Sequence, residues 1–218
     1  MLVELNDVLN NAYEGGMWGT PTLLRYLSEG QDKFCEETGY WRDVDNFTLT
    51  LKTGVVRYAV PDRVIEVMEI WNGTNKLGKY SHDDIKTTGF EFDPFSIIAQ
   101  TGMPTEWKID EGTGLITFDK TPTATENRTS LQLRVWRYSL CDLADDNAEP
   151  ELPARLQRAC VEWAAYKAFN HHDMEAQDPV KGKEHYANFM AYVTDGKKAL
   201  RRLHGIDVEI ASNPLYRA

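Results

Sequence analysis

Hydrophobic positions divide the chain into three zones that differ in period. In the first zone, buried-type side chains recur every three or four residues, which predicts an amphipathic helix of about five turns. The positions are Leu23, Leu24, Leu27, Gln31, Phe34, Cys35 and Thr38. Thr20 and Pro21 supply the expected cap and first-turn proline, and Gly39 ends the helix. A shorter helix is predicted over residues 2–13, ahead of a glycine pair.

The second zone alternates between apolar and polar residues, which indicates β-strands. Asn72 and Gly73 form the expected hairpin turn after one of these runs. Because no crossover helices lie between the runs, we expect an antiparallel sandwich or a small barrel. Residues 81–102 are the least regular part and leave room for one short helix. The predicted strands cover residues 47–51, 55–60, 64–73, 107–110, 115–119 and 131–140.

The third zone returns to helical spacing after an acidic linker at residues 142–153. One helix is predicted from Pro153 to about residue 178, with Leu156, Cys160 and Trp163 on one side. A second helix begins near residue 181 and ends at Gly205. Its apolar side carries Tyr186, Phe189, Met190, Val193 and Leu200. The two helices form a hairpin, and residues 205–218 are expected to form an extended arm.

Together these zones predict an α+β protein built as a helical bundle with an inserted domain. N-terminal helices (1–45) pack against the C-terminal helix hairpin (142–204), since each has one apolar face that needs cover. An antiparallel β-sandwich-like domain (46–141) interrupts this bundle, and the extended C-terminal arm (205–218) follows it.

Charge and cysteine content narrow the function classes. The 218-residue chain has 34 acidic and 24 basic residues and a formal net charge of -10. Nonspecific binding to DNA phosphates is therefore unfavourable, and we expect the protein to repel DNA. The cysteines, Cys35, Cys141 and Cys160, form no CxxC pair, so we expect reduced thiols in the cytosol. No apolar run reaches the roughly 20 residues that a membrane span needs, and we expect a soluble protein without a signal peptide.

Residues 171–175 hold two histidines, an aspartate and a glutamate, which raises the question of a metal site. On a helix, His171 and Glu175 share one side, while His172 points about a quarter turn away. A zinc site usually needs three or four converging ligands, and the HExxH pattern is not matched. We interpret the stretch as the polar end of a packing helix. The alternative is a metal hydrolase built on His171, His172, Asp173 and Glu175.

Other sequence signals of enzymatic chemistry are absent. The chain has no Walker loop, no nucleophile elbow and no dinucleotide fingerprint, so we expect no catalytic residues and no cofactor. Its six tryptophans suggest a second alternative, a carbohydrate-binding module on which sugars stack. They are equally suited to a core or a protein interface. Trp163 fits the core, whereas Trp71, beside a turn, is the best candidate for an exposed contact.

Four segments resemble the head-tail adaptor (connector) proteins of tailed bacteriophages. They are MWGTPTLLRYLSEGQDKFCEETGYWRD (17–43), FTLTLKTGVVRYAVPDRVIEVMEIWNGTNKL (47–77), PTEWKIDEGTGLITFDKTPT (104–123) and ELPARLQRACVEWAAYKAF (151–169). The resemblance implies a non-enzymatic structural protein of the virion neck, assembled in the bacterial cytoplasm. It implies a ring, typically of twelve copies, that joins the portal to tail or nozzle proteins. DNA then passes through the ring without sequence-specific binding.

The resemblance also implies that the C-terminal arm docks on the portal protein. A basic cluster at the end of the last helix fits either a contact with an acidic portal surface or complementarity to the helix dipole. The expected portal-docking residues are Lys197, Lys198, Arg201, Arg202, Ile206, Val208, Ile210, Pro214, Leu215, Tyr216 and Arg217.

Overall fold

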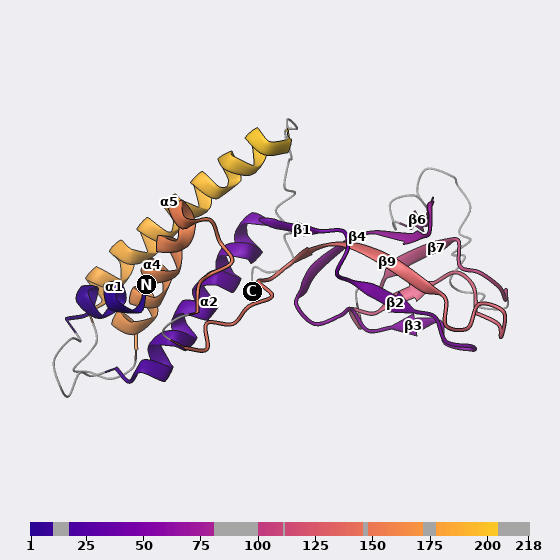
Figure 1. Cartoon of the computed structure of the whole chain (residues 1–218), viewed down its shortest axis with the longest axis horizontal. Coiled ribbons are helices and arrows are strands. Elements are labelled where there is room, and N and C mark those ends of the chain that lie inside the picture. Colours follow the sequence, from indigo (N-terminus) through magenta and orange to yellow (C-terminus); the bar gives the residue numbers. More distant parts are fainter. Residues whose placement is uncertain (11–17, 81–99, 111, 146–147, 172–177, 205–218) are drawn as a thin grey trace. The chain divides into compact units, whose positions relative to one another are not determined.

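The computed structural model describes residues 1–10, 18–80, 100–110, 112–145, 148–171 and 178–204. Its contacts divide the chain into two compact units. The helical unit comprises Met1–Tyr40 and Ser139–Ala218, and the β unit comprises Trp41–Tyr138. Figure 1 shows the helices and strands of both units. The predicted α+β class is confirmed.

Four helices make up the described part of the helical unit: α1 (Leu2–Val8), α2 (Thr20–Thr38), α4 (Ala154–Phe169) and α5 (Pro179–His204). Helix α4 packs against the three others, and α2 also contacts α5. The whole predicted apolar face of α2 is buried. The predicted Thr20 cap is wrong, because Thr20 already belongs to the helix and Gly19 is the N-cap residue. Gly39 ends α2 in the left-handed conformation, as predicted.

Small residues let the helices approach closely. The alanines of α4 at positions 159, 164, 165 and 168 are fully buried. On α2, a Cβ atom placed at Gly30 would lie 3.0 Å from both the Cα and the carbonyl oxygen of Cys160. The backbones of α2 and α4 therefore meet at Gly30, where no larger side chain fits. None of the described helices combines the length and apolar character that a membrane span requires.

The linker that leads from the β unit back to α4 is fastened to α2 by a buried glutamine. Gln31 is 1% exposed. Its Nε2 donates to the carbonyl oxygen of Cys141 at 2.9 Å, and its Oε1 accepts from the backbone N–H of Glu151 at 2.8 Å. Ser28 adds a third tie, because its hydroxyl accepts from the N–H of Leu143. One polar side chain on the apolar face of α2 thus holds both ends of the linker.

Replacing Gln31 by leucine is expected to destabilise the helical unit by about 1–3 kcal/mol. The substitution removes the acceptor of the Glu151 N–H and one of the two donors to the Cys141 carbonyl, which Ser139 still reaches at 3.1 Å. A polar group left without its partner away from water costs about 1–3 kcal/mol. Urea denaturation of the full chain measures the change. Gln157→Leu is the control, because Gln157 is only half-buried and donates a single hydrogen bond, to Leu152. Equal losses for the two variants would contradict a special role of Gln31.

The β unit contains nine described strands in two sheets. Their bounds are β1 (Trp41–Asp43), β2 (Thr48–Thr50), β3 (Arg57–Tyr58), β4 (Val64–Asn72), β5 (Asn75–Lys76), β6 (Gly78–Lys79), β7 (Glu106–Ile109), β8 (Ile116–Phe118) and β9 (Ser130–Arg137). The first sheet has the order β1-β9-β4-β5, with β2 also paired to β9, and the second has the order β3-β8-β7-β6.

The predicted antiparallel pairing is confirmed for all pairs of described strands but one. Strands β6 and β7 run parallel, because the connection between them is long enough for the chain to return in the same direction. Most of the irregular segment 81–102, including the short helix considered there, lies outside the described residues. A turn at Gly73 and Thr74 joins β4 to β5, one residue later than the predicted Asn72–Gly73 turn, because Asn72 still pairs with Asn75.

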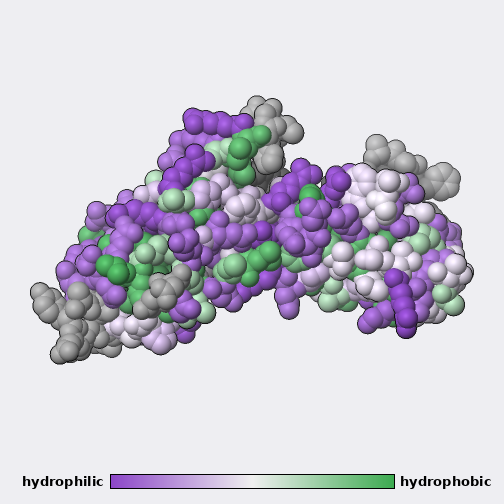
Figure 2. Space-filling view, in the orientation of Figure 1, coloured by the Kyte–Doolittle hydropathy of each residue, from purple (hydrophilic) through white to green (hydrophobic). Residues whose placement is uncertain are grey.

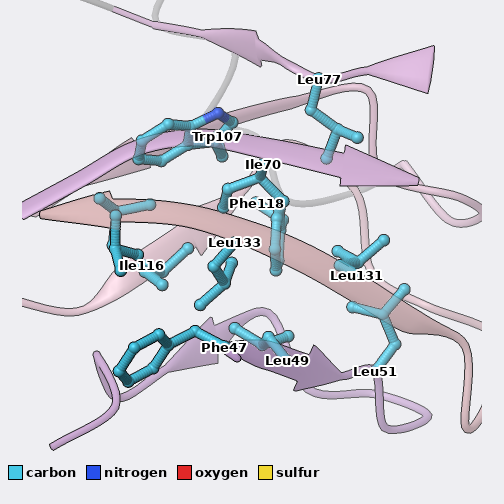
Figure 3. Close-up of a cluster of buried hydrophobic side chains, with 12 residues drawn as sticks. Phe47, Leu49, Leu51, Ile70, Leu77, Trp107, Ile116, Phe118, Leu131 and Leu133 are labelled. Atoms are coloured by element: carbon cyan, nitrogen blue, oxygen red, sulfur yellow. The ribbon is translucent and has the colours of Figure 1, made fainter. Parts of the chain in front are cut away.

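Both sheets contribute to one buried apolar cluster. Figure 3 shows side chains from β2, β4, β7, β8 and β9 pointing toward one another. Trp107 and Phe118 are the largest of them and are fully buried. Along β9 the cluster takes every second residue, Leu131, Leu133 and Val135. This period of two is the reason that β9 could be recognised in the sequence.

The chain enters and leaves the β unit through two paired strands. β1 pairs with the end of β9, with Trp41 opposite Arg137 and Asp43 opposite Val135. A buried ion pair joins the two strands, with Arg137 Nε 2.8 Å from Asp43 Oδ2. Burial raises the pKa of Asp43, but hydrogen bonds from Asn46, from the Asp45 N–H and from Arg137 outweigh it and hold the pKa at about 2.

Candidate functional site

The C-terminal end of α5 is the best candidate surface for docking, because the helix outruns its neighbours there. α5 runs antiparallel to α4, with Phe189 5.0 Å from Trp163 and His185 stacked on Phe169 at 5.4 Å between ring centroids. Continuing this register places the start of α4 opposite Lys197 and Lys198. In Figure 1 the last turns of α5 extend past the other helices of the helical unit.

The contact between α5 and α2 leads to the same conclusion. A Cβ atom at Gly196 would lie 2.6 Å from Cζ of Phe34 and 3.3 Å from Cγ2 of Thr38. Thr38 is the last residue of α2, so α2 covers α5 only for about one further turn. Neither α2 nor α4 therefore covers the final turn of α5.

This uncovered end is basic. Lys198, Arg201 and Arg202 are exposed, and Lys197 is half-buried. Lys198 forms an ion pair with Asp195 at 3.2 Å. Among the described residues, no acidic side chain forms an ion pair with the other three cations. Leu203 beside them is 70% exposed. Figure 2 shows mostly hydrophilic side chains at this end, next to a small hydrophobic spot.

Two interpretations of the basic end therefore remain. The cations lie near a helix C-terminus, where they complement the dipole. Leu203 is exposed beside three cations that form no ion pair with described residues. The helix dipole does not require an exposed leucine, so this side chain offers an apolar contact to a partner. The predicted arm residues lie outside the described part of the chain: Ile206, Val208, Ile210, Pro214, Leu215, Tyr216 and Arg217.

The proposed metal cluster is only partly within the described residues. His171 is exposed, and its ring stands edge-on to Trp18 at 5.0 Å between centroids. His172, Asp173 and Glu175 lie outside the described residues. Within the part of the chain that the structure describes, no group of three potential ligands converges. The interpretation of this stretch as the end of a packing helix is wrong for His171, because α4 already ends at Phe169 and Asn170 is its C-cap residue. The contact with Trp18 joins the residues just after α4 to those just before α2.

Sequence reasoning missed a buried carboxylate between α4 and α5. Glu162 is 4% exposed. It receives hydrogen bonds from Asn188 at 3.2 Å and Arg158 at 3.2 Å, and His185 Nδ1 lies 2.8 Å from it. Burial raises the pKa of Glu162, but the contacts with His185, Asn188 and Arg158 outweigh it, so the pKa is lowered. Its partners lie on both α4 and α5, so Glu162 links these two helices.

The cysteines of the helical core are structural. Cys35 and Cys160 are fully buried, as predicted from their places on apolar helix faces. Burial raises the pKa of Cys160 far above its ordinary value, which leaves the thiol protonated and unreactive.

Trp71, the tryptophan expected to be exposed, is half-buried and already has a partner on its ring face. The guanidinium of Arg134 lies 4.2 Å from the ring centroid, and the indole N–H donates to Glu69 at 2.8 Å. A sugar that stacked on Trp71 would have to use the opposite face of the ring. Trp107 is fully buried in the core of the β unit, so it has no surface to offer a sugar.

Comparison with known proteins identifies the family. The family model described as SU10 adaptor protein matches residues 1–215. No curated protein matches the chain significantly. The family match spans both units and thus covers nearly all of the sequence. The chain belongs to the SU10 adaptor protein family, a family of bacteriophage structural adaptors.

Proposed function

We propose that the protein is a head-tail adaptor whose copies form a ring beneath the portal vertex of a tailed phage. The ring joins the capsid to tail or nozzle proteins, in the neck of the virion, and surrounds the channel for the genome. Family membership supports the adaptor role. The observation that carries the portal contact is the uncovered basic end of α5, with Lys197, Arg201 and Arg202 free of ion pairs to described residues and Leu203 exposed beside them.

In this proposal the end of α5 and the arm at residues 205–218 form the portal side. A helix end that projects beyond its neighbours reaches a partner without rearrangement of the helical core. The arm adds contact area at the cost of the entropy lost when it becomes ordered on docking. Cations at the end of α5 then face an acidic portal surface, which would steer and orient docking.

The contacts between copies and the charge of the channel follow from the repetition of one chain around an axis. A closed ring needs two different, complementary surfaces on each copy. We propose twelve copies, as the resemblance to head-tail adaptors implies. The net charge of -10 per chain gives the ring a negative potential, so that DNA passes without binding. The inserted β-sandwich-like domain faces tail components or the neighbouring copy.

Reversing two charges at the end of α5 is expected to weaken portal binding. Arg201→Glu combined with Arg202→Glu replaces attraction to an acidic surface with repulsion, and we expect at least a tenfold loss of affinity. The measurement is capture of the full chain by the purified portal protein of the same phage, at low and at physiological salt. The wild-type affinity should fall as salt rises, because exposed charges are screened.

The control carries the same charge change at the other end of the same helix. Lys181→Glu combined with Lys183→Glu alters exposed residues near the start of α5. Its portal affinity should remain within about twofold of the wild type, since the docking contact lies at the other end. If both pairs reduce capture equally, the effect reflects overall charge and the assignment to the end of α5 is wrong.

A further inference from the structure

The outer face of the larger sheet carries a second candidate surface, independent of α5. On β9 the residues between the buried positions are Gln132, Arg134 and Trp136, which are half-buried on the face away from the core. Neighbouring strands extend this face. Arg42 on β1 lies opposite Trp136, and Trp71 on β4 lies opposite Gln132.

Two register shifts on β4 keep its polar and aromatic residues on this face. The shifts lie between Val64 and Glu66 and between Val67 and Glu69. They leave Glu69 opposite Arg134. A bulge inserts one residue and so changes which side chain points outward. We call the resulting surface the Trp–Arg face and define it by Arg42, Glu66, Glu69, Trp71, Lys76, Arg134 and Trp136.

One half of the Trp–Arg face is held rigidly before any partner binds. Glu69 accepts from Lys76 Nζ at 2.7 Å, from the indole N–H of Trp71 at 2.8 Å and from Arg134 at 3.1 Å. Arg134 also covers the Trp71 ring at 4.2 Å. The hydrogen bonds from Lys76 and Trp71 hold the pKa of Glu69 at about 2, so it stays ionised. A fixed arrangement lowers the ordering cost of binding.

The other half offers an unpaired cation beside a large ring. Arg42 is exposed, and no described acidic residue forms an ion pair with it. Trp136 lies next to it on β9 and is half-buried. Trp and Arg are the residues most enriched at the energetic centres of protein interfaces. Three cations, Arg42, Lys76 and Arg134, lie on this face with two carboxylates, Glu66 and Glu69, although the protein as a whole is strongly acidic.

The chain itself contains a surface of opposite charge. Residues 139–145 and 148–153, the acidic segment, contain aspartates and glutamates but no lysine or arginine. Asp142, Asp145 and Glu149 are exposed, and Leu140 is 46% exposed among them. Gln31 ties Cys141 and Glu151, near the two ends of the segment, to α2. These ties lower the ordering cost of binding through the described carboxylates and Leu140.

We infer that the Trp–Arg face of one copy binds the acidic segment of a second copy. The two surfaces differ and are complementary in charge, so the contact is heterologous and propagates around a ring. This inference rests on the proposed ring and names the surfaces that build it. DNA is the less suitable occupant of this basic face, because a chain with a net charge of -10 repels a phosphate backbone.

Photocrosslinking tests the inference directly. The full chain carries p-benzoylphenylalanine in place of Trp136 and is irradiated both free and bound to the portal protein. We expect a crosslinked dimer in which the attached peptide comes from residues 139–153 of the second copy. Crosslinks to another part of the second copy, to the portal alone, or no crosslinked dimer in either sample would overturn the inference.

Charge exchange gives a second test that does not depend on the crosslinker. The face variant combines Arg42→Glu with Lys76→Glu, and the segment variant combines Asp142→Lys with Glu149→Lys. Each alone should associate at least tenfold more weakly than the wild type in sedimentation velocity. A mixture of the two should recover association, because each reversed surface then meets its complement. Failure of the mixture to recover would contradict the pairing.

Controls separate this inference from the proposed function. Lys52→Glu combined with Arg57→Glu changes the same charge at exposed positions away from the Trp–Arg face and should leave association unchanged. Portal capture is measured on every variant. If the portal captures the chain but the predicted crosslink does not form, the inference about the Trp–Arg face is wrong and the proposed function stands. If the portal does not capture even the wild-type chain, the proposed function is wrong. Retention of duplex DNA by the wild type, lost in the face variant, would assign the face to DNA instead.

Discussion

Replacing Arg137 by methionine is expected to destabilise the β unit by about 3–5 kcal/mol. The substitution leaves the Asp43 carboxylate buried without its cation, and breaking one partner of a buried ion pair typically costs this much. The two side chains are 8% and 5% exposed, so water does not replace the lost partner. Because β1 and β9 are the strands by which the chain enters and leaves the unit, the loss should appear as separation of this strand pair first.

Urea denaturation measures the change, and Arg57→Met serves as the control because Arg57 is exposed on β3. The control should stay within about 0.5 kcal/mol of the wild type. A loss below about 1 kcal/mol for Arg137→Met would mean that Asp43 is solvated and that the pair is not a structural link.

The same ion pair sets an acid dependence of stability. The folded pKa of Asp43 is lowered from 3.8 to about 2. A lowered pKa means that its stabilisation is fully present above pH 3.8 and is lost as the pH falls toward 2. The wild type should therefore lose about 2 kcal/mol over this interval from Asp43 alone. In Arg137→Met this part of the acid dependence should shrink, which a pH series of thermal unfolding would detect.

Replacing Gly30 by leucine is expected to destabilise the helical unit by more than about 3 kcal/mol. A side chain at this position meets the backbone of Cys160, which has no rotamer to move aside. Overpacking usually costs about 1–3 kcal/mol, and contact with backbone places this case at the upper end or beyond. The higher helix propensity of leucine returns less than about 1 kcal/mol. We expect α2 and α4 to separate and the far-ultraviolet helical signal to melt at a lower temperature.

Glu36→Leu provides the comparison, since it introduces the same residue into α2 at an exposed position. Its effect should remain within about 0.5 kcal/mol, because it only removes a surface ion pair with Lys33. If Gly30→Leu unfolds at the same temperature as Glu36→Leu, the close approach of α2 and α4 is not required for the fold.

The helices were predictable because each has one face that packs against the others. Residues such as Leu27 and Phe34 repeat at helical spacing, and the same residues are buried. Gln31 belonged to this pattern although it is polar, and its burial is explained only by partners more than one hundred residues away. The spacing of residues within α2 was enough to identify its buried face. The hydrogen bonds that make the burial of Gln31 favourable depend on the tertiary fold.

The strands were predictable where their alternation is regular, as on β9. β1 was missed because its few residues, Trp41–Asp43, are too short to show a period. The outward position of Trp71 depends on bulges in β4, which appear only once β9 is paired with it. Glu162 next to Arg158 has the spacing of a solvated helix pair, and only the packing of α5 over it makes it buried.

The candidate docking surface was only partly accessible to sequence reasoning. The cations from Lys197 to Arg202 stood out as a cluster at a helix end. Their lack of cover was not predictable, because it depends on how far α2 and α4 extend alongside α5. That register is set by close contacts at Gly196 and by ring stacking between His185 and Phe169.

Electron microscopy of the full chain mixed with the portal protein of the same phage is the most direct test of the adaptor assignment. We predict a ring of additional density on one side of the portal, coaxial with its channel, with the end of α5 at the contact. Portal particles that remain bare at saturating concentrations of the chain, or that bind it in irregular positions without a ring, would contradict the assignment.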